Sequence, residues 1–147
     1  MRLKTIVRLS FCGFVAVVAG VPASAQQATP VPAAAKLNVE LNALTPSAKG
    51  CVMTFVAEND MATPINKISF ELAFFNDKNA VDKITVLDFR DLPIGKKRVR
   101  QFDMANVKCE AVTRVIINDT PVCDGPAAGE CKAALTTKSQ ISVPFEG

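Results

Sequence analysis

From Leu37 to the C-terminus, apolar and polar residues alternate along most of the chain with a period of two. The clearest run covers residues 67–75, and its apolar side chains fall on one face of an extended chain: Ile68, Phe70, Leu72 and Phe74. A period of two is typical of a strand with one buried face, because successive side chains point to opposite sides. Neither a heptad pattern nor an internal repeat competes with it, so we predict an all-β fold.

The same alternation predicts seven strands, at residues 37–42, 51–58, 67–75, 83–89, 97–104, 110–118 and 135–145. Clusters of turn-forming residues separate them, including Asn76-Asp77-Lys78-Asn79 and Leu92-Pro93-Ile94-Gly95. Seven short strands with turns between them are typical of an antiparallel β-sandwich. We therefore expect one sandwich domain, residues 37–147.

The first 25 residues have the pattern of a secretory signal peptide, with a basic start, an apolar run at 9–20 and the small residues Ala23-Ser24-Ala25. The apolar run is shorter than the roughly 20 residues of a membrane-spanning helix. Arg8 has no adjacent arginine, which favours the general secretory route. We expect cleavage after Ala25, a flexible lead at residues 26–36, a periplasmic or secreted product and no transmembrane segment.

Four cysteines remain after the leader, and with it Cys12, is removed: Cys51, Cys109, Cys123 and Cys131. An even number in an oxidising compartment predicts two disulfides, with three possible connectivities. We favour Cys51–Cys109 and Cys123–Cys131, because the second pair encloses a turn-rich stretch at 124–130. Redox activity and a zinc site are the alternatives, and no Cys-x-x-Cys motif supports either. We expect no metal and no cofactor.

The chain contains no histidine, which excludes Ser-His-Asp and Cys-His catalysis and histidine-ligated metals. Its net charge of +3 comes from 17 basic and 14 acidic residues, and three of the basic ones lie in the leader. The mature chain is therefore neutral. Export and the absence of Tyr and Trp, whose rings would stack on bases, make nucleic acid an unexpected partner.

One local cluster departs from this balance and forms the candidate interaction patch: Lys96, Lys97, Arg98 and Arg100. Alternation places Arg98 and Arg100 on the same face of a strand as Phe102, with Lys97 on the other face. The first interpretation is a charged edge strand that blocks aggregation. The second is a docking patch for an acidic protein or an anionic envelope component.

Cys51 and Cys109 fall in phase with the apolar faces of the second and sixth expected strands, 58 positions apart. Two inward cysteines on these strands would join the two sheets, which resembles the immunoglobulin arrangement. The chain lacks that fold's buried tryptophan and its tyrosine corner.

A second resemblance rests on a set of short motifs: Gly50-Cys51, Asn59, Phe70-Glu71-Leu72, Asp91-Leu92-Pro93-Ile94-Gly95-Lys96, Val99-Arg100-Gln101-Phe102-Asp103, Cys109, Ile117-Asn118-Asp119 and Cys123. Together they resemble a family of small exported alphaproteobacterial proteins of unknown function, labelled twin-arginine signal-sequence domain proteins. The resemblance implies export and carries no known activity.

Strands are predicted along the whole domain, and the sequence contains no recognisable catalytic motif. The functional prediction therefore rests on the exclusion of catalytic classes. We predict a non-catalytic periplasmic sandwich that binds a protein or an envelope component, with an edge strand as the contact surface. The alternative is a small carboxylate-dependent hydrolase of envelope glycans, which needs two acids about 5–9.5 Å apart. Asp88 and Asp91 are the nearest candidates for such a pair. No feature of the sequence identifies the ligand or the oligomeric state.

Overall fold

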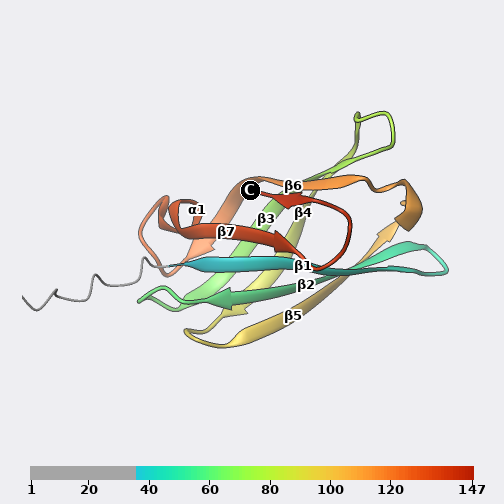
Figure 1. Cartoon of the computed structure of the whole chain (residues 1–147). Coiled ribbons are helices and arrows are strands. Elements are labelled where there is room, and N and C mark those ends of the chain that lie inside the picture. Colours follow the sequence, from blue (N-terminus) through green and yellow to red (C-terminus); the bar gives the residue numbers. More distant parts are fainter. Residues whose placement is uncertain (1–35) are drawn as a thin grey trace, which may run out of the picture. The chain divides into compact units, whose positions relative to one another are not determined.

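A computed structural model describes residues 36–147 as an all-β domain of two four-stranded sheets (Figure 1). The elements follow in the order β1 (Leu37–Pro46), β2 (Gly50–Asn59), β3 (Ile65–Phe75), β4 (Val81–Leu92), β5 (Lys97–Ala105), η1 (Cys109–Ala111), β6 (Arg114–Asp124), α1 (Glu130–Ala134), β7 (Leu135–Ser139) and β8 (Phe145–Glu146). The expected signal peptide, and residues 26–35 of the expected lead, lie outside the described residues.

Sheet one has the strand order β5-β2-β1-β7, and sheet two has the order β4-β3-β6-β8. Figure 1 shows the strands of sheet one side by side in the front layer, with β3 and β4 behind them. Within residues 36–147, no helix has the length and apolar character needed to cross a membrane.

The core lies between the sheets and follows the alternation expected from the sequence. In β2 every second residue is fully buried, from Cys51 to Ala57, while the residues between them are partly exposed. Phenylalanines from both sheets meet in the centre: the ring centroids of Phe55 and Phe89 lie 5.4 Å apart, and those of Phe70 and Phe89 lie 5.0 Å apart. Edge-to-face contacts of this kind add to the stabilisation from apolar burial.

The prediction of one last strand at 135–145 is wrong, because that stretch forms two strands in different sheets. β7 pairs in parallel with β1, and β8 pairs in parallel with β6, so the sandwich has eight strands and is not wholly antiparallel. Ser139 ends β7 with a side-chain turn: its hydroxyl accepts from the Ile141 amide and donates to the Ile141 carbonyl. The chain then crosses to sheet two before Phe145.

The sixth strand begins at Arg114 rather than at residue 110. Residues 109–111 form a short 3-10 helix instead, closed by hydrogen bonds from the Ala111 amide to Lys108 and from the Val112 amide to Cys109. Thr113 then joins the end of β3, since its amide and hydroxyl both donate to the Phe75 carbonyl. The other five expected strands all lie within observed ones.

Candidate functional site

The structure joins Cys51 to Cys109 and Cys123 to Cys131, which is the favoured pairing. The first bond departs from the expected geometry, because Cys109 lies in η1 and not on β6. It therefore ties β2 of sheet one to the connection that carries the chain over to sheet two. A bond between strands of the two sheets, as in an immunoglobulin domain, is not what forms here.

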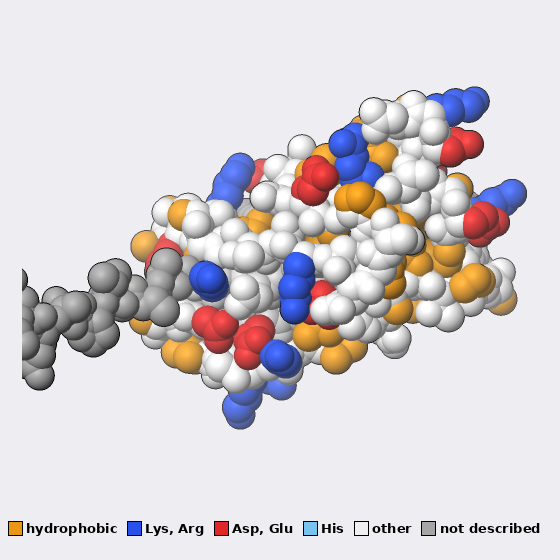
Figure 2. All heavy atoms as spheres, in the orientation of Figure 1, with side chains coloured by type: hydrophobic (Ala, Val, Ile, Leu, Met, Phe, Trp, Pro, Cys, Tyr) orange, Lys and Arg blue, Asp and Glu red, His pale blue; other side chains and the backbone are white. Residues whose placement is uncertain are grey.

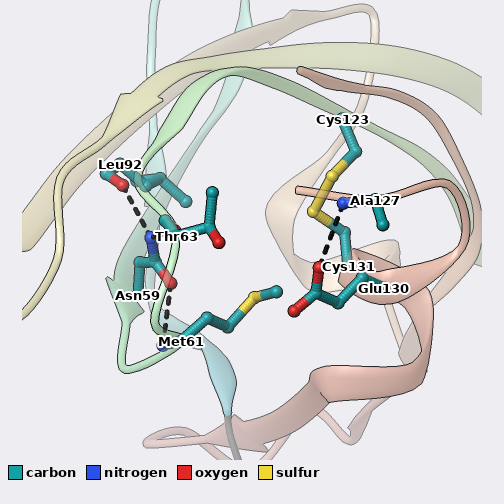
Figure 3. Close-up of a disulfide and its surroundings, with 8 residues drawn as sticks. All are labelled: Asn59, Met61, Thr63, Leu92, Cys123, Ala127, Glu130 and Cys131. Atoms are coloured by element: carbon teal, nitrogen blue, oxygen red, sulfur yellow. Dashed lines mark hydrogen bonds between the residues drawn. A yellow bond between two sulfur atoms is a disulfide. The ribbon is translucent and has the colours of Figure 1, made fainter. Parts of the chain in front are cut away.

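The second disulfide lies at one end of the sandwich and connects β6 to α1 (Figure 3). Cys131 is buried, and the carboxylate of Glu130 accepts a 3.0 Å hydrogen bond from the Ala127 amide, which closes the enclosed loop. All four cysteines of the described part are thus in disulfides, so none offers a thiolate to zinc. No group of three potential metal ligands gathers anywhere in residues 36–147.

Three of the four patch residues have acidic partners. Lys97 Nζ lies 3.7 Å from the Glu58 carboxylate, Arg98 Nη2 lies 3.0 Å from Asp91 Oδ2, and Arg100 Nη2 lies 3.4 Å from Asp91 Oδ1. The hydrogen bond from Arg98 lowers the pKa of Asp91. Lys96 makes no ion pair with a described residue. Glu58 and Asp91 therefore offset two of the four positive charges expected at this patch.

Arg100 also closes part of the edge of sheet two. Its side chain is only 18% exposed. Nε donates a 2.6 Å hydrogen bond to the Phe89 carbonyl, and Nη2 donates a 3.1 Å bond to the Asp91 carbonyl. β5 and β4 are edge strands of their own sheets, so this side chain bridges the open side of the sandwich. Inward-pointing charges on an edge strand are a known protection against edge-to-edge pairing.

A second basic side chain bridges the same two strands farther along, where Lys83 Nζ donates a 3.3 Å hydrogen bond to the Ala105 carbonyl. Between the two bridges lies a groove of about 560 Å³, which we call the β4–β5 groove. Its lining is half apolar and half polar: Val86, Leu87, Val99 and Phe102, with Asp88, Arg90, Arg100 and Gln101.

Two exposed apolar side chains, Val86 and Val99, line this groove, and the others lie on β4 or in the turn that follows it. Within residues 36–147 the large hydrophobic residues with high exposure are 49–60% exposed, and all of them lie between positions 81 and 99: Val81, Ile84, Val86, Ile94 and Val99. This site was not among the sites predicted from the sequence. Ile84 and Val86 are apolar residues on the otherwise polar face of the expected strand 83–89, and that break in alternation was the available signal.

Two ion pairs lie on the outer face of sheet one, where Figure 2 shows acidic and basic side chains close together. Lys138 Nζ lies 2.7 Å from Glu40 Oε2 and forms an ion pair between β7 and β1. Glu58 forms a second ion pair with Lys97. A hollow of about 270 Å³ between them is lined by both acids and both lysines. This hollow presents a balanced surface rather than a field of one sign.

The acids nominated for catalysis are engaged in local structure. Asp88 Oδ1 accepts a 2.8 Å hydrogen bond from the Arg90 amide, which holds a bulge where Arg90 adopts a φ of 61°. Asp91 is held by two arginines. The carboxyls whose pKa is shifted, Glu40, Asp91 and Asp119, are all shifted downward. A general acid for glycoside hydrolysis needs the opposite direction.

No family model matches the chain, and no curated protein or solved structure matches it either. The β4–β5 groove is therefore the candidate functional site.

Proposed function

We propose that this protein is an exported, non-catalytic Ig-like β-sandwich that binds another protein of the cell envelope at the β4–β5 groove. The observation that carries the proposal is the concentration of exposed apolar side chains between Val81 and Val99. Apolar patches rimmed by polar residues mark interaction sites on protein surfaces. Two of these exposed apolar residues, Val86 and Val99, line the β4–β5 groove together with Phe102. A partner could bury this apolar surface.

A protein partner accounts for this surface better than an anionic envelope component does. Half of the positive charge of Lys96, Lys97, Arg98 and Arg100 is offset by Glu58 and Asp91, which weakens the field that this patch presents. An anionic polymer or lipid surface is attracted by a field of one sign, whereas a protein interface has an apolar centre with a polar rim. The groove has the second composition.

Export is supported by two independent features. Disulfides such as Cys51–Cys109 and Cys123–Cys131 form and persist in oxidising compartments. The pattern of residues 1–25 is that of a secretory leader, and such a leader would direct the mature protein to the periplasm or out of the cell. The resemblance to small exported alphaproteobacterial proteins agrees with this compartment and adds no activity. No observation favours the glycan hydrolase.

Site-specific photo-cross-linking tests the proposed surface. A photoreactive amino acid is placed at position 84 or 99, and the control carries it at Thr136, an exposed residue of β7 on the opposite edge of sheet one. We expect a discrete cross-linked protein from envelope extract at positions 84 and 99 only. Val86→Lys, which puts a charge in the lining of the groove, should abolish the product. Equal labelling at position 136, or a product that survives Val86→Lys, would refute the proposal.

A further inference from the structure

We propose that the partner binds as an extended segment that adds a strand to the first part of β4, residues 81–87, and places a bulky apolar side chain in the β4–β5 groove. This inference rests on the proposed function and specifies the partner's chemistry. It follows from the main-chain groups on the edge of sheet two. Arg100 binds those from Phe89 onward, whereas no described side chain binds those of residues 81–87, where Lys83 reaches past them to the Ala105 carbonyl of β5.

The edge of β4 is divided at Phe89. Beyond that residue, the Arg100 guanidinium occupies the carbonyls of Phe89 and Asp91, so an incoming strand finds these acceptors already bound. Before it, no side chain of the described part hydrogen-bonds to the main chain of residues 81–87. Strand addition uses the unpaired main-chain groups of an edge strand. The available length is therefore seven residues, or roughly 23 Å of extended chain.

The groove explains why an added strand would be held by a side chain as well as by its backbone. Alternate residues of a strand on this edge point toward the sandwich interior. There Phe102 is half-buried, with its ring centroid 5.1 Å from that of Phe89, and Leu87 is nearly buried beside it. An apolar side chain of the partner would extend this cluster and lose contact with water. Outward-facing residues of the same segment would meet Ile84 and Val86.

The end of the groove nearest the β4–β5 turn carries an excess of positive charge. This excess favours acidic residues at one end of the partner's segment. Four basic side chains, those of Arg90, Lys96, Arg98 and Arg100, stand there against two acidic ones, those of Asp88 and Asp91. Arg90 is exposed and, like Lys96, forms no ion pair with a described residue. An acidic residue at the end of the segment that lies near Arg90 would complement this excess. The partner is thus an extended, apolar segment with an acidic end.

A second copy of this chain meets like charges in the register that pairs its exposed apolar side chains with one another. Two-fold antiparallel pairing centred on Thr85 would place Ile84 opposite Val86, which is favourable. The same register places Asp82 of each copy opposite Asp88 of the other, and like charges in directly opposed positions are destabilising. We therefore commit to a heterologous segment.

The test is selection of a displayed library of random nine-residue peptides on the immobilised full-length mature protein. We expect enriched peptides to alternate apolar and polar residues and to carry Asp or Glu near one end. A labelled enriched peptide should bind at least tenfold more weakly to Val86→Lys and to Arg90→Glu. Matched controls are Thr136→Lys and Lys132→Glu, exposed positions away from the groove, which should leave binding unchanged. Hydrogen exchange of the complex should slow at residues 81–87.

The outcomes separate this inference from the proposed function. Enriched peptides without alternation, or slowed exchange outside β4, would overturn strand addition while the cross-links at positions 84 and 99 stand. Equal binding to wild type and Val86→Lys would do the same. Enrichment of purely acidic peptides, together with binding to phosphatidylglycerol vesicles, would replace it with electrostatic docking. A protein that is dimeric in solution and monomeric as Val86→Lys would replace it with self-association. Loss of the cross-links themselves would refute the proposed function.

Discussion

Arg100 Nε donates a 2.6 Å hydrogen bond to the main-chain carbonyl of Phe89, and the same guanidinium reaches the carbonyl and the carboxylate of Asp91 through Nη2. One side chain of β5 thus satisfies two carbonyls on the edge of β4. The planar fork of arginine allows this, because its donors point in fixed, divergent directions. The contact holds the two sheets together at the side where neither has a further strand.

Replacing Arg100 with lysine should therefore destabilise the protein although the charge is kept. A lysine ammonium cannot reproduce the fork, and hydrogen bonds from charged donors contribute about 1.5–3 kcal/mol. We expect Arg100→Lys to lower the free energy of unfolding by about 2 kcal/mol in urea titrations. Lys97→Ala is the control: the Lys97 side chain is 68% exposed, and its ion pair should contribute no more than about 0.5 kcal/mol. Equal losses for the two variants would contradict the bridging role of Arg100.

Asn59 is a fully buried polar residue, and both its side-chain nitrogen and its side-chain oxygen form hydrogen bonds with the main chain (Figure 3). Nδ2 donates to the carbonyls of Thr63 and Leu92, and Oδ1 accepts from the Met61 amide, each at 3.0 Å. Asn59→Ala leaves these buried groups unpaired, so we expect a loss of about 3 kcal/mol in thermal or chemical unfolding. The exposed Asn118→Ala should change stability by less than about 0.5 kcal/mol.

Asn59→Asp sharpens this test, because it keeps the size of the side chain and replaces the donor with an oxygen. That oxygen would face two carbonyls, so the variant should be less stable than Asn59→Ala at neutral pH. Acidification should narrow the difference, since protonation restores one donor. A variant as stable as the wild type at pH 7 would show that the network contributes little.

Gly50 begins β2 at a point where the chain has no room for a side chain. A Cβ added there would overlap the main-chain oxygen of Met104 in β5, which the sheet holds in place. We expect Gly50→Ala to cost about 2–3 kcal/mol or more, because the backbone of two paired strands must shift. Gly95→Ala is the control: its φ of 66° costs about 1 kcal/mol, and nothing lies within 4 Å of the added atom. Comparable melting temperatures for the two variants would contradict the steric argument.

Periodicity predicted most of the strands because it is a local property, whereas a change of sheet is not. Residues 110–113 carry Val112 and Thr113, which favour strands, yet the bond from Cys109 to Cys51 places that stretch in the connection between sheets. Ile141 and Val143 continue the alternation up to Phe145, which predicted one strand through residues 135–145. In the structure these two residues lie in the segment that crosses from β7 to β8.

The same limit explains what was missed at the candidate site. The positive cluster was visible in the sequence, but its compensation by Asp91 depends on how the turn between β4 and β5 folds back. The groove needs two strands from different sheets, and no local pattern encodes their separation. The sequence did indicate the favoured pairing of the four cysteines and the shared face of Arg98, Arg100 and Phe102, a face that the structure turns inward.

Glu40 should make the protein sensitive to acid. Hydrogen bonds from Lys138 and Asn42, with a weaker one from Gln140, lower its pKa from 4.5 to about 2. A carboxyl with a lowered pKa in the folded state contributes stability above its unfolded pKa, and this contribution is lost as the pH falls from about 5 to about 2. We expect a contribution of about 1–2 kcal/mol, because the side chain of its partner Lys138 is 62% exposed and the ion pair is screened by water.

The variant Glu40→Gln isolates that contribution. It should be less stable than the wild type at pH 7, and the difference should shrink steadily as unfolding is measured at pH 5, 4 and 3. A difference that stays constant with pH would show that the pKa of Glu40 is not lowered by folding.

The two disulfides should differ in how much they stabilise the fold, and loop length is the reason. Cys51 and Cys131 are both buried, so burial does not separate them. The bonds close loops with sequence separations of 58 and 8 residues. In the chain-entropy treatment these loops correspond to about 4 and about 2.6 kcal/mol of destabilisation of the unfolded state. The paired variant Cys51→Ala with Cys109→Ala should therefore melt at a lower temperature than Cys123→Ala with Cys131→Ala. Paired replacements leave no free thiol to exchange, and the reverse order of melting temperatures would mean that the short loop does more than limit the entropy of the unfolded chain.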